Sequence, residues 1–525
     1  MCCMYSQGSA SRRWNVYRSG RTVSRALHRS YFAFSAVHLV FFHPLAKFPG
    51  PKLWAASRIP WAFHVIRGDL WQVLGRLHEV YGPVVRIAPD ELTTTFPSAW
   101  KELYASKPLL LKDPYSQTPP LNGSHSLFTA EGDTHRRIRA VLSHSFSEKG
   151  LRSQACIIEK YADRFIRRVR READQSLGPN GIGAVDLTKL YGYAAFDTIT
   201  DLSLGESLCD GLKDMNEHAW VKNYFFHAKF SAIRTALSRF SPLDIILGLF
   251  LLGMTRSARQ RNWRVITGAL NRRLARRETE AMETKRYDLL SPLMDRLDGS
   301  GSNSITRGEM LTNGLAFVIA GTQLNTNVLS TATYLVLRHK EKWGRLVEEV
   351  RGRFEADSNI TVQTTQDLTY LDAVINETIR IRHPTPINLP RIVPRGGHVV
   401  NGQPIPGNVV IGINLQTIQN SSAFWIKPRE FHPERFLPAM DPRYDNCFNK
   451  DVKEAFAPFS TGPRNCVGNK LFFAQVRVLL ARVVWNFDLV QLEEVGAQTD
   501  WLDQRAWFAF EPRPLLVKPV PRPST

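Results

Sequence analysis

The sequence predicts a mainly α-helical protein with a small β-rich region. Apolar residues recur at helical spacing through most of the chain, whereas strand-like alternation is confined to two stretches. The composition is that of a globular protein, with 43% hydrophobic and 22% charged residues. At 525 residues, the chain is long enough for one large enzyme core or for two or three ordinary domains.

Residues 1–44 are expected to form a basic leader with a short, membrane-anchor-like segment. Arginine is frequent from Arg12 to Arg29, and no acidic residue precedes Asp69. The uncharged, aromatic-rich run 30–42 has thirteen residues, whereas a spanning helix needs roughly twenty. A short anchor, a helix lying in the membrane interface and an ordinary buried helix are three interpretations of this run. An Arg- and Ser-rich leader without acids also resembles a mitochondrial transit peptide.

The remainder, residues 45–525, is expected to be a single domain whose elements follow from hydrophobic periodicity. Strands are expected within 82–96 and, joined by Gly, Asn and Pro turns, within 391–414. The stretch 298–308 is expected to be a loop that ends in a helix start. The predicted helices are 74–81, 132–146, 149–173, 190–205, 259–286, 306–337, 339–355, 369–382 and 467–485.

The charge and the cysteines exclude several classes of function. The net charge is +20, but the basic residues do not gather with aromatics in a nucleic-acid-binding motif, so no nucleic-acid partner is expected. A second basic cluster, at 256–286, is either a solvated helix face or a surface for an anionic membrane or acidic partner. The six cysteines form no CxxC pair, which argues against structural zinc and a disulfide framework.

One cysteine stands in a loop that suits a thiolate. Cys466 lies in "PFSTGPRNCVG", two residues after Arg464 and just before a long helical pattern. A nearby cation and a helix N-terminus both stabilise a thiolate, and Phe459 could shield the sulfur from water. Gly468 has no side chain and so lets a flat ligand approach the backbone closely. An axial ligand to haem iron, a nucleophile and an inert buried thiol are the alternatives that these residues leave open.

The motif "FSTGPRNCVG" resembles the haem-binding signature F-x-x-G-x-R-x-C-x-G of the cytochrome P-450 family at every fixed position. The resemblance runs from about residue 43 to 490. It implies the family's fold, in which haem b lies between the long central helix and the helix after the cysteine loop, with Cys466 as the iron ligand. Within the family, the segments "HPLAKFPGPKLW" and "LPRIVPRGG" look like filamentous-fungal members of secondary metabolism.

Other motifs of this family occur in the expected order. Glu377 and Arg380 of "ETIR", with Arg435 of "FHPERF", match a buried charge cluster that is structural. His135 and Arg139 of "HRRIR" resemble the pair that reaches the haem propionates, for which cationic donors are natural partners. The haem contacts implied by the resemblance comprise His135, Arg139, Arg391, Phe459, Arg464 and Gly468.

The central helix departs from the family pattern in "AGTQLNTN", residues 320–327. Relatives have an acid and an alcohol here that deliver protons during oxygen activation, whereas this chain has Gln323 and Leu324. Leucine cannot relay a proton. Gly321 is expected to leave room for oxygen, and Asn325, at i+4 from it, to hold a water; Thr326 and Thr322 are weaker candidates. A further departure is Gln419–Asn420, where relatives often have His-Arg.

The resemblance implies a monooxygenase that inserts one oxygen atom of O2 into a lipophilic small molecule, such as a terpenoid, polyketide or alkaloid intermediate. Electrons would come from NADPH through a flavoprotein reductase at the cytosolic face of the endoplasmic reticulum, with the mitochondrion as the alternative address. A haem-thiolate isomerase or dehydratase and a non-catalytic haem or lipid binder are the other hypotheses. An apolar cavity is expected from the segments 105–130 and 215–255, which include Phe225, Phe226, Phe230 and Phe240.

Overall fold

The computed structural model describes residues 30–522 apart from short internal gaps. The gaps are residues 32, 118–119, 121–122, 177–182, 209, 213–228, 241–242, 280–285, 300, 302 and 493–499. The predicted pocket residues Phe225 and Phe226 therefore lie outside the described part, as does most of the leader. Within the described part, no helix is both long and apolar enough to cross a membrane.

The fold is mainly helical with a small β-rich region, as the sequence predicts. The helices that match predicted segments are α4 (Leu70–Tyr81), α6 (Gly132–Ser143), α7 (Glu148–Gln175), α8 (Leu187–Leu204), α10 (Leu243–Thr279), α12 (Arg307–Arg338), α13 (Lys340–Arg353), α14 (Thr369–Ile381) and α16 (Asn469–Asn486). Short helices that periodicity did not predict are α2 (Lys52–Ala56), α3 (Ile59–Arg67), α5 (Ala99–Tyr104), α11 (Ser291–Met294) and α15 (Leu415–Gln419). These have nine residues or fewer, too few for a repeating pattern.

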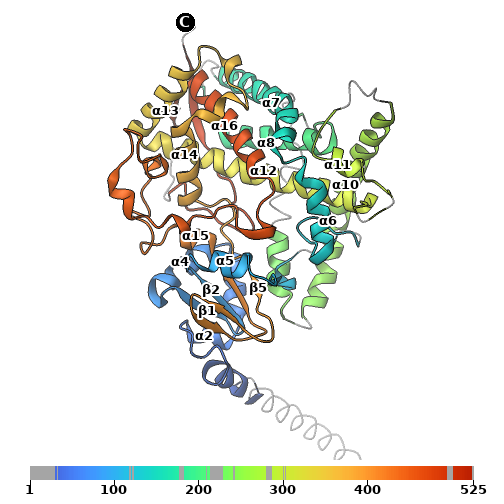
Figure 1. Ribbon diagram of the computed structural model, residues 1–525, viewed down its shortest axis with the longest axis vertical. Helices are drawn as coiled ribbons and strands as arrows, with labels where there is room; N and C mark the ends of the chain where they lie inside the picture. Colours follow the sequence, from blue (N-terminus) through green and yellow to red (C-terminus); the bar gives the residue numbers. More distant parts are fainter. Residues whose placement is uncertain are drawn as a thin grey trace, which may run out of the picture.

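The main sheet lies at one end of the molecule, below the helical body (Figure 1). Its strand order is β1-β2-β8-β5-β3, and only the β2–β8 pair is parallel. A three-stranded sheet, β4-β10-β9, and the hairpin β6–β7 complete the β structure. The strands are β1 (Val84–Ala88), β2 (Glu91–Thr94), β3 (Leu111–Lys112), β4 (Val185–Asp186), β5 (Arg391–Ile392), β6 (His398–Val400), β7 (Gln403–Ile405), β8 (Val410–Ile413), β9 (Phe487–Gln491) and β10 (Leu516–Pro521).

Helix α12 is the central element of the helical body. A capping box starts it: the Thr306 hydroxyl accepts from the Glu309 N–H, and the Glu309 carboxylate accepts from the Thr306 N–H. Its 32 residues span roughly 48 Å. It packs along α8 and also contacts α14 and α16, and the largest hydrophobic core surrounds it. The prediction of a domain-crossing helix from residue 306 is thus confirmed.

Helix α10 differs from its prediction. The expected helix 259–286 begins sixteen residues earlier, at Leu243, so the apolar run 245–254 belongs to the same helix rather than to a separate segment. The two parts form one helix because the change from apolar to basic side chains does not interrupt the backbone hydrogen bonds. In the basic part Arg273 is buried against Asp288 at 3.1 Å, while Arg272 and Arg276 are exposed and pair with Glu206.

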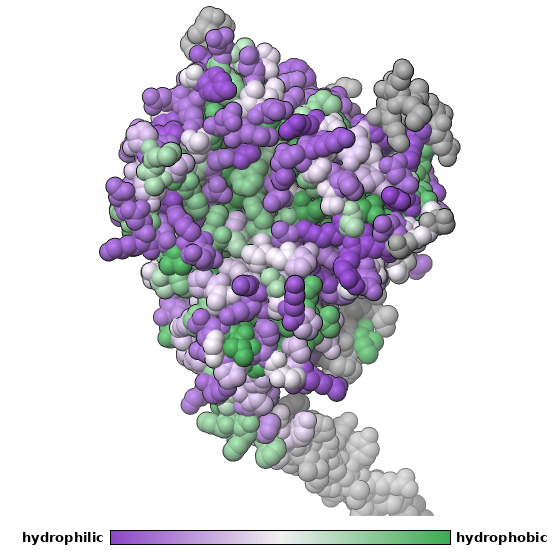
Figure 2. All heavy atoms as spheres, in the orientation of Figure 1, coloured by the Kyte–Doolittle hydropathy of each residue, from purple (hydrophilic) through white to green (hydrophobic). Residues whose placement is uncertain are grey.

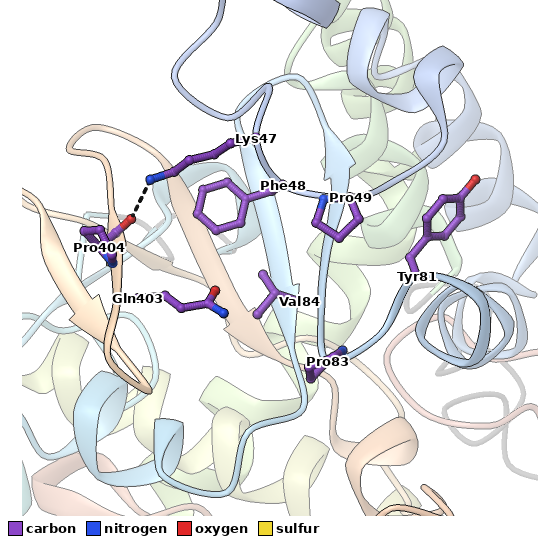
Figure 3. Close-up of a pocket in the computed structure, with 8 residues that line it drawn as sticks. All are labelled: Lys47, Phe48, Pro49, Tyr81, Pro83, Val84, Gln403 and Pro404. Carbon is purple, nitrogen blue, oxygen red and sulfur yellow. Dashed lines mark hydrogen bonds between the residues drawn. The ribbon is translucent and has the colours of Figure 1, made fainter.

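The segment around Pro49 and Gly50, which precedes the main sheet, packs directly against strand β1. The N–H of Arg86 donates to the carbonyl of Pro49 over 2.8 Å. A Cβ on Gly50 would lie 2.4 Å from the Arg86 carbonyl oxygen, so this close approach requires glycine. A shallow pocket of about 330 Å³ lies beside this contact, where Lys47 Nζ donates to the carbonyl of Pro404 over 3.3 Å (Figure 3). It contains none of the predicted site residues.

Candidate functional site

The cysteine loop runs from Pro458 into α16 and has a tightly constrained backbone. Gly462 has a φ of 75°, and a Cβ there would lie 2.2 Å from the carbonyl oxygen of Tyr104, so only glycine fits. The N–H of Cys466 donates to the carbonyl of Phe459 over 2.9 Å. These contacts hold Cys466 three residues before α16 begins.

The thiol of Cys466 is not packed against other side chains on every side. The side chain is accessible although it lies deep among protein atoms, and burial raises its pKa, while the N–H of Gly468 and the charge of Arg139 act in the opposite direction. Phe459 packs with Phe472 and Phe473 at centroid distances of 5.5 and 5.7 Å, which gives the loop an apolar lining. A single sulfur beside aromatic cover and open space is the arrangement that an axial haem ligand needs.

The ring of Phe146 lies between helix α12 and the cysteine loop. A Cβ on Gly468 would lie 3.8 Å from the ring of Phe146, and that ring meets Phe317 of α12 edge-on at 5.6 Å. Gly468 therefore keeps the space between Cys466 and Phe146 open. The loop that carries the thiol and the central helix are brought together here, as the predicted site requires.

A cationic cluster stands beside the cysteine loop, formed by five basic side chains. They are Lys112, His135, Arg139, Arg391 and Arg464, and each is coupled electrostatically to at least one other member or to Cys466. Burial, together with Arg464, Lys112 and Arg139, lowers the pKa of His135 to about 4, so at neutral pH this member of the cluster is an uncharged hydrogen-bond donor. Burial and Arg464 lower the pKa of Lys112 to about 8. His135, Arg139 and Arg391, which the resemblance implies as propionate partners, are thus gathered in one place with Arg464.

This cluster fits a group with two carboxylates. Lys112 and Arg391 stand directly opposite each other on β3 and β5, an arrangement that destabilises a sheet unless an anion neutralises it. Among the contacts of the described residues, Glu131 supplies a carboxylate, which Arg464 binds, yet Arg464 Nε remains buried without a partner. Haem carries two propionates, so the cations, the thiol and the open space match what it requires.

Hydrogen bonds and an aromatic contact fix the side chains of Arg139 and Arg391. Arg139 donates to the backbone carbonyl of Asn465 over 2.7 Å and to its side chain, which braces the cysteine loop. The guanidinium of Arg391 lies 4.8 Å above the ring of Tyr104 and donates to the carbonyl of Pro390. Lys112 is the member that sequence reasoning missed, because its two-residue strand has no periodicity and only the pairing with β5 places it here.

Behind the loop, the predicted charge cluster is fully buried and contains one more member than expected. Arg380 forms a bidentate pair with Glu377, at 2.7 and 2.8 Å, and Arg435 also contacts Glu377. Arg435 pairs in addition with Asp451 at 2.5 Å. Two arginines therefore face two carboxylates, all with 0% side-chain exposure, and the half-exposed Lys453 lies 3.9 Å from Asp451. Asp451 belongs to no motif that the sequence displays.

The residues of α12 around the departure from the family pattern contact different neighbouring helices. Asn325 donates its side-chain amide to Gln475 of α16. Gly321 has a packing role as well, since a Cβ there would lie 2.6 Å from Ile199 of α8. Leu324, at the position of the usual alcohol, remains partly exposed.

The other polar side chains of this stretch bind within the protein. The Thr322 hydroxyl donates to the carbonyl of Val318, and the Thr326 hydroxyl donates to that of Thr322. Gln323 donates to Asn327 and to the carbonyl of Phe510. Such back-bonding is ordinary for threonine in a helix.

The predicted pocket segments are described only in part. Phe240 packs against a small core formed by α2–α4 and β1, and Arg239 from the same segment pairs with Asp113. Arg234 donates to the carbonyl of Gln117 over 3.3 Å. The segments around 113–117 and 229–240 are therefore neighbours, as two walls of one pocket would be.

A model of the cytochrome P450 family matches residues 49–518. The chain belongs to this family. Among its curated relatives, an averantin hydroxylase of Dothistroma septosporum is 35% identical over 92% of this chain and 88% of its own length. A cytochrome P450 monooxygenase lcsI of Purpureocillium lilacinum is 34% identical over 95% and 94%. A versicolorin B desaturase of Dothistroma septosporum is 34% identical over 92% and 90%.

The P450 family assignment confirms the prediction made from the cysteine motif and its companions. This P450 is a haem-dependent monooxygenase of the fungal secondary-metabolism type. Cys466 and the cationic cluster are the residues that fit the haem, although their individual roles stay predictions.

Proposed function

We propose that this P450 oxidises a lipophilic intermediate that carries a hydroxyl group, and that this hydroxyl takes part in proton delivery. Haem b, held by Cys466 and by the cationic cluster of Lys112, His135, Arg139, Arg391 and Arg464, would supply the oxygen-activating chemistry. The relatives include a hydroxylase and a desaturase, so hydroxylation and desaturation are the reactions that the proposal covers.

The observation that carries the proposal is the apolar character of α12 at Leu324. Leucine has no hydrogen-bonding group. The neighbouring hydroxyls of Thr322 and Thr326 donate to carbonyls of their own helix, and Asn325 donates to Gln475. General acid catalysis needs a donor within hydrogen-bonding reach of the reacting atom. A substrate hydroxyl meets that need without a protein side chain.

The test compares a hydroxylated substrate with its deoxy analogue in the presence of reductase, NADPH and isotope-labelled O2. We expect label in the product and, with the deoxy analogue, at least roughly ten-fold more peroxide released per NADPH, as befits the loss of a general acid. Equal peroxide release from both compounds contradicts the substrate-hydroxyl role. Turnover without reductase, or an unlabelled product, would instead indicate an isomerase or dehydratase.

Asn325 is the protein alternative to the substrate hydroxyl. If a water on Asn325 delivers the proton, Asn325→Leu raises peroxide release with every substrate, whether or not it carries a hydroxyl. If the substrate delivers it, Asn325→Leu leaves the difference between hydroxylated and deoxy substrates intact. The same preparations are checked by their ferrous carbon monoxide spectrum, whose red-shifted band reports a thiolate ligand and is expected to vanish in Cys466→Ser.

Electrons are proposed to come from NADPH through a flavoprotein reductase that docks on the face around the start of α16. Exposed cations gather here: Lys149 and Arg152 on α7, and Lys470 on α16. Lys470 lies 2.7 Å from Glu148, whose pKa it lowers. A basic face close to the cysteine loop suits an acidic partner, because opposite charges steer association.

The end of the molecule that carries α2 and α3 is proposed to rest on a membrane, at the cytosolic face of the endoplasmic reticulum. Large apolar side chains are exposed there: Phe34, Phe41, Phe42, Leu53, Ile59 and Phe63, each at least 55% exposed. We call these six residues the foot patch. Figure 2 shows hydrophobic residues gathered at this end. Patches of this kind mark interaction sites rather than ordinary surface.

A further inference from the structure

The C-terminal loop 502–511 is tied to the central helix by two side-chain amides. Gln323 Nε2 and Asn327 Nδ2 both donate to the carbonyl oxygen of Phe510, over 3.5 and 3.3 Å. Gln323 Nε2 also donates to Asn327 Oδ1 over 3.1 Å, so each amide orients the other. The two side chains are 4% and 7% exposed. We call this arrangement the amide clamp.

The ring of Phe510 is held independently of its carbonyl. The guanidinium of Arg382, at the end of α14, lies 3.6 Å from the ring centroid, and Trp71 of α4 meets the ring edge-on at 5.2 Å. Arg382 also donates to the Gln504 side chain over 2.9 Å and to the carbonyl of Leu502. Three helices therefore determine where this loop lies.

The remainder of the loop reaches the end of α3 and the segment 229–240. The N–H of Ala506 donates to the carbonyl of Gly68 over 2.8 Å, and Trp507 Nε1 donates to that of Ile66. The ammonium of Lys229 lies 4.9 Å above the Trp507 ring, which joins the loop to the segment 229–240. Phe508, at the tip, is 41% exposed and offers an aromatic surface.

The clamp requires an amide at residue 323. An ionised carboxylate only accepts hydrogen bonds, so an acid at this position could not donate to the carbonyl of Phe510, whereas an amide can. Gln323 is also the immediate neighbour of Leu324. The clamp and Leu324 therefore lie on the same turn of α12.

We propose that Gln323 and Asn327 are positioning residues that set loop 502–511 against the substrate, and thereby select which substrate atom is oxidised. They are not part of a proton path. The choice of the oxidised atom rests on the proposed monooxygenase function. The amide clamp does not, because it is formed by the protein without substrate. Two measurements separate these parts.

The first measurement is hydrogen exchange of the full-length holoenzyme without substrate. Gln323→Met keeps the volume of the side chain and removes its donor, and Asn327→Leu removes the other donor. Each variant is expected to raise exchange at the amides of residues 504–511 by roughly three- to ten-fold, the range for one lost hydrogen bond. Asn325→Leu is the matched control, because Asn325 is equally buried in the same helix but binds Gln475 of α16. It should leave this loop unchanged.

The second measurement is the ratio of oxidation products and the peroxide released per NADPH. Gln323→Met and Asn327→Leu are expected to change the product ratio at least three-fold while peroxide release per NADPH stays within two-fold of the unmodified protein. Wild-type exchange in both variants overturns the clamp, as does an increase of the same size in Asn325→Leu. Greater exchange with an unchanged product ratio overturns the selection role. If the unmodified protein oxidises nothing, the proposed function fails while the exchange result stands.

Discussion

At the scale of single residues, His383 connects the end of α14 to the cysteine loop. Its Nε2 lies 3.0 Å from the carbonyl of Pro458, and the N–H of Thr385 donates to its Nδ1 over 3.1 Å. Nδ1 also lies 2.9 Å from the carbonyl oxygen of Thr385, so both ring nitrogens have backbone partners. Burial lowers the pKa of His383 to about 4. Nothing in the sequence marks this histidine, because its partner lies 75 residues away.

His383 should make the stability of the protein depend on acid. Its pKa in the folded state lies below the ordinary value of 6.5, so the unfolded chain binds more protons between these values. The stabilising effect is complete above pH 6.5 and is lost as the pH falls towards 4, by roughly 3 kcal/mol. Urea unfolding of the holoenzyme at several pH values measures this. His383→Gln can still donate to Pro458 but cannot titrate, and a variant with an equally steep acid limb would contradict the assignment.

At the scale of elements, the buried charge cluster joins α14 to the segments around Arg435 and Asp451. Arg380 also donates to the backbone carbonyls of Gln419, Pro428 and Glu430, and both arginines lie within 6 Å of the Trp425 ring centre. Buried charges of this kind stabilise a fold only while every partner is present. The cluster thus fixes one helix against the chain that leads into the cysteine loop.

Glu377→Gln should be strongly destabilising, because it leaves two buried arginines opposite one carboxylate. We expect a loss of roughly 3–5 kcal/mol, measured as a lower urea midpoint of the holoenzyme. Glu341→Gln is the comparison: Glu341 pairs with Arg345 on α13 but is 67% exposed, and its loss should cost less than about 1 kcal/mol. Equal midpoints for the two variants would show that the cluster contributes no more than a surface ion pair.

At the scale of the whole molecule, the proposed reductase face and the foot patch lie in different places. The exposed cations Lys149, Arg152 and Lys470 lie around the starts of α7 and α16, in the helical body, whereas the foot patch lies beyond the sheet, at the lower end of the structure in Figure 1. The two proposed partners, a reductase and a membrane, therefore meet different faces. Both can bind at once without competing for the same residues.

The foot patch predicts binding to lipid vesicles. Replacing Phe42 and Phe63 together by serine should reduce co-flotation of the full-length protein with phosphatidylcholine vesicles by at least roughly ten-fold, because each ring loses its burial in lipid. Met440→Ser is the matched control, since Met440 is 92% exposed and belongs to a different surface segment. Flotation that is equal in all three proteins would rule out the foot patch as the membrane contact.

Much of the fold could be predicted from the sequence because its long helices have a complete hydrophobic period. Helices α7, α8, α12 and α16 lie within a few residues of their predicted bounds. The predicted start of α10 was wrong. An apolar run followed by arginines looks like two segments, although the backbone continues as one helix. Short helices such as α2 and α15 gave no signal, since their ends are decided by packing against the sheet and α14.

The sequence by itself determined the metal chemistry: the five fixed residues of the cysteine motif, Cys466 included, and the ordered motifs before it indicated haem, and the family match agrees. Only the tertiary structure decided what the polar residues of α12 contact. Asn325 faces α16, and Gln323 and Asn327 hold a loop that lies more than 180 residues away in the chain. A motif is local and can be read along the chain, whereas the partner of a buried amide depends on which distant segment packs against it.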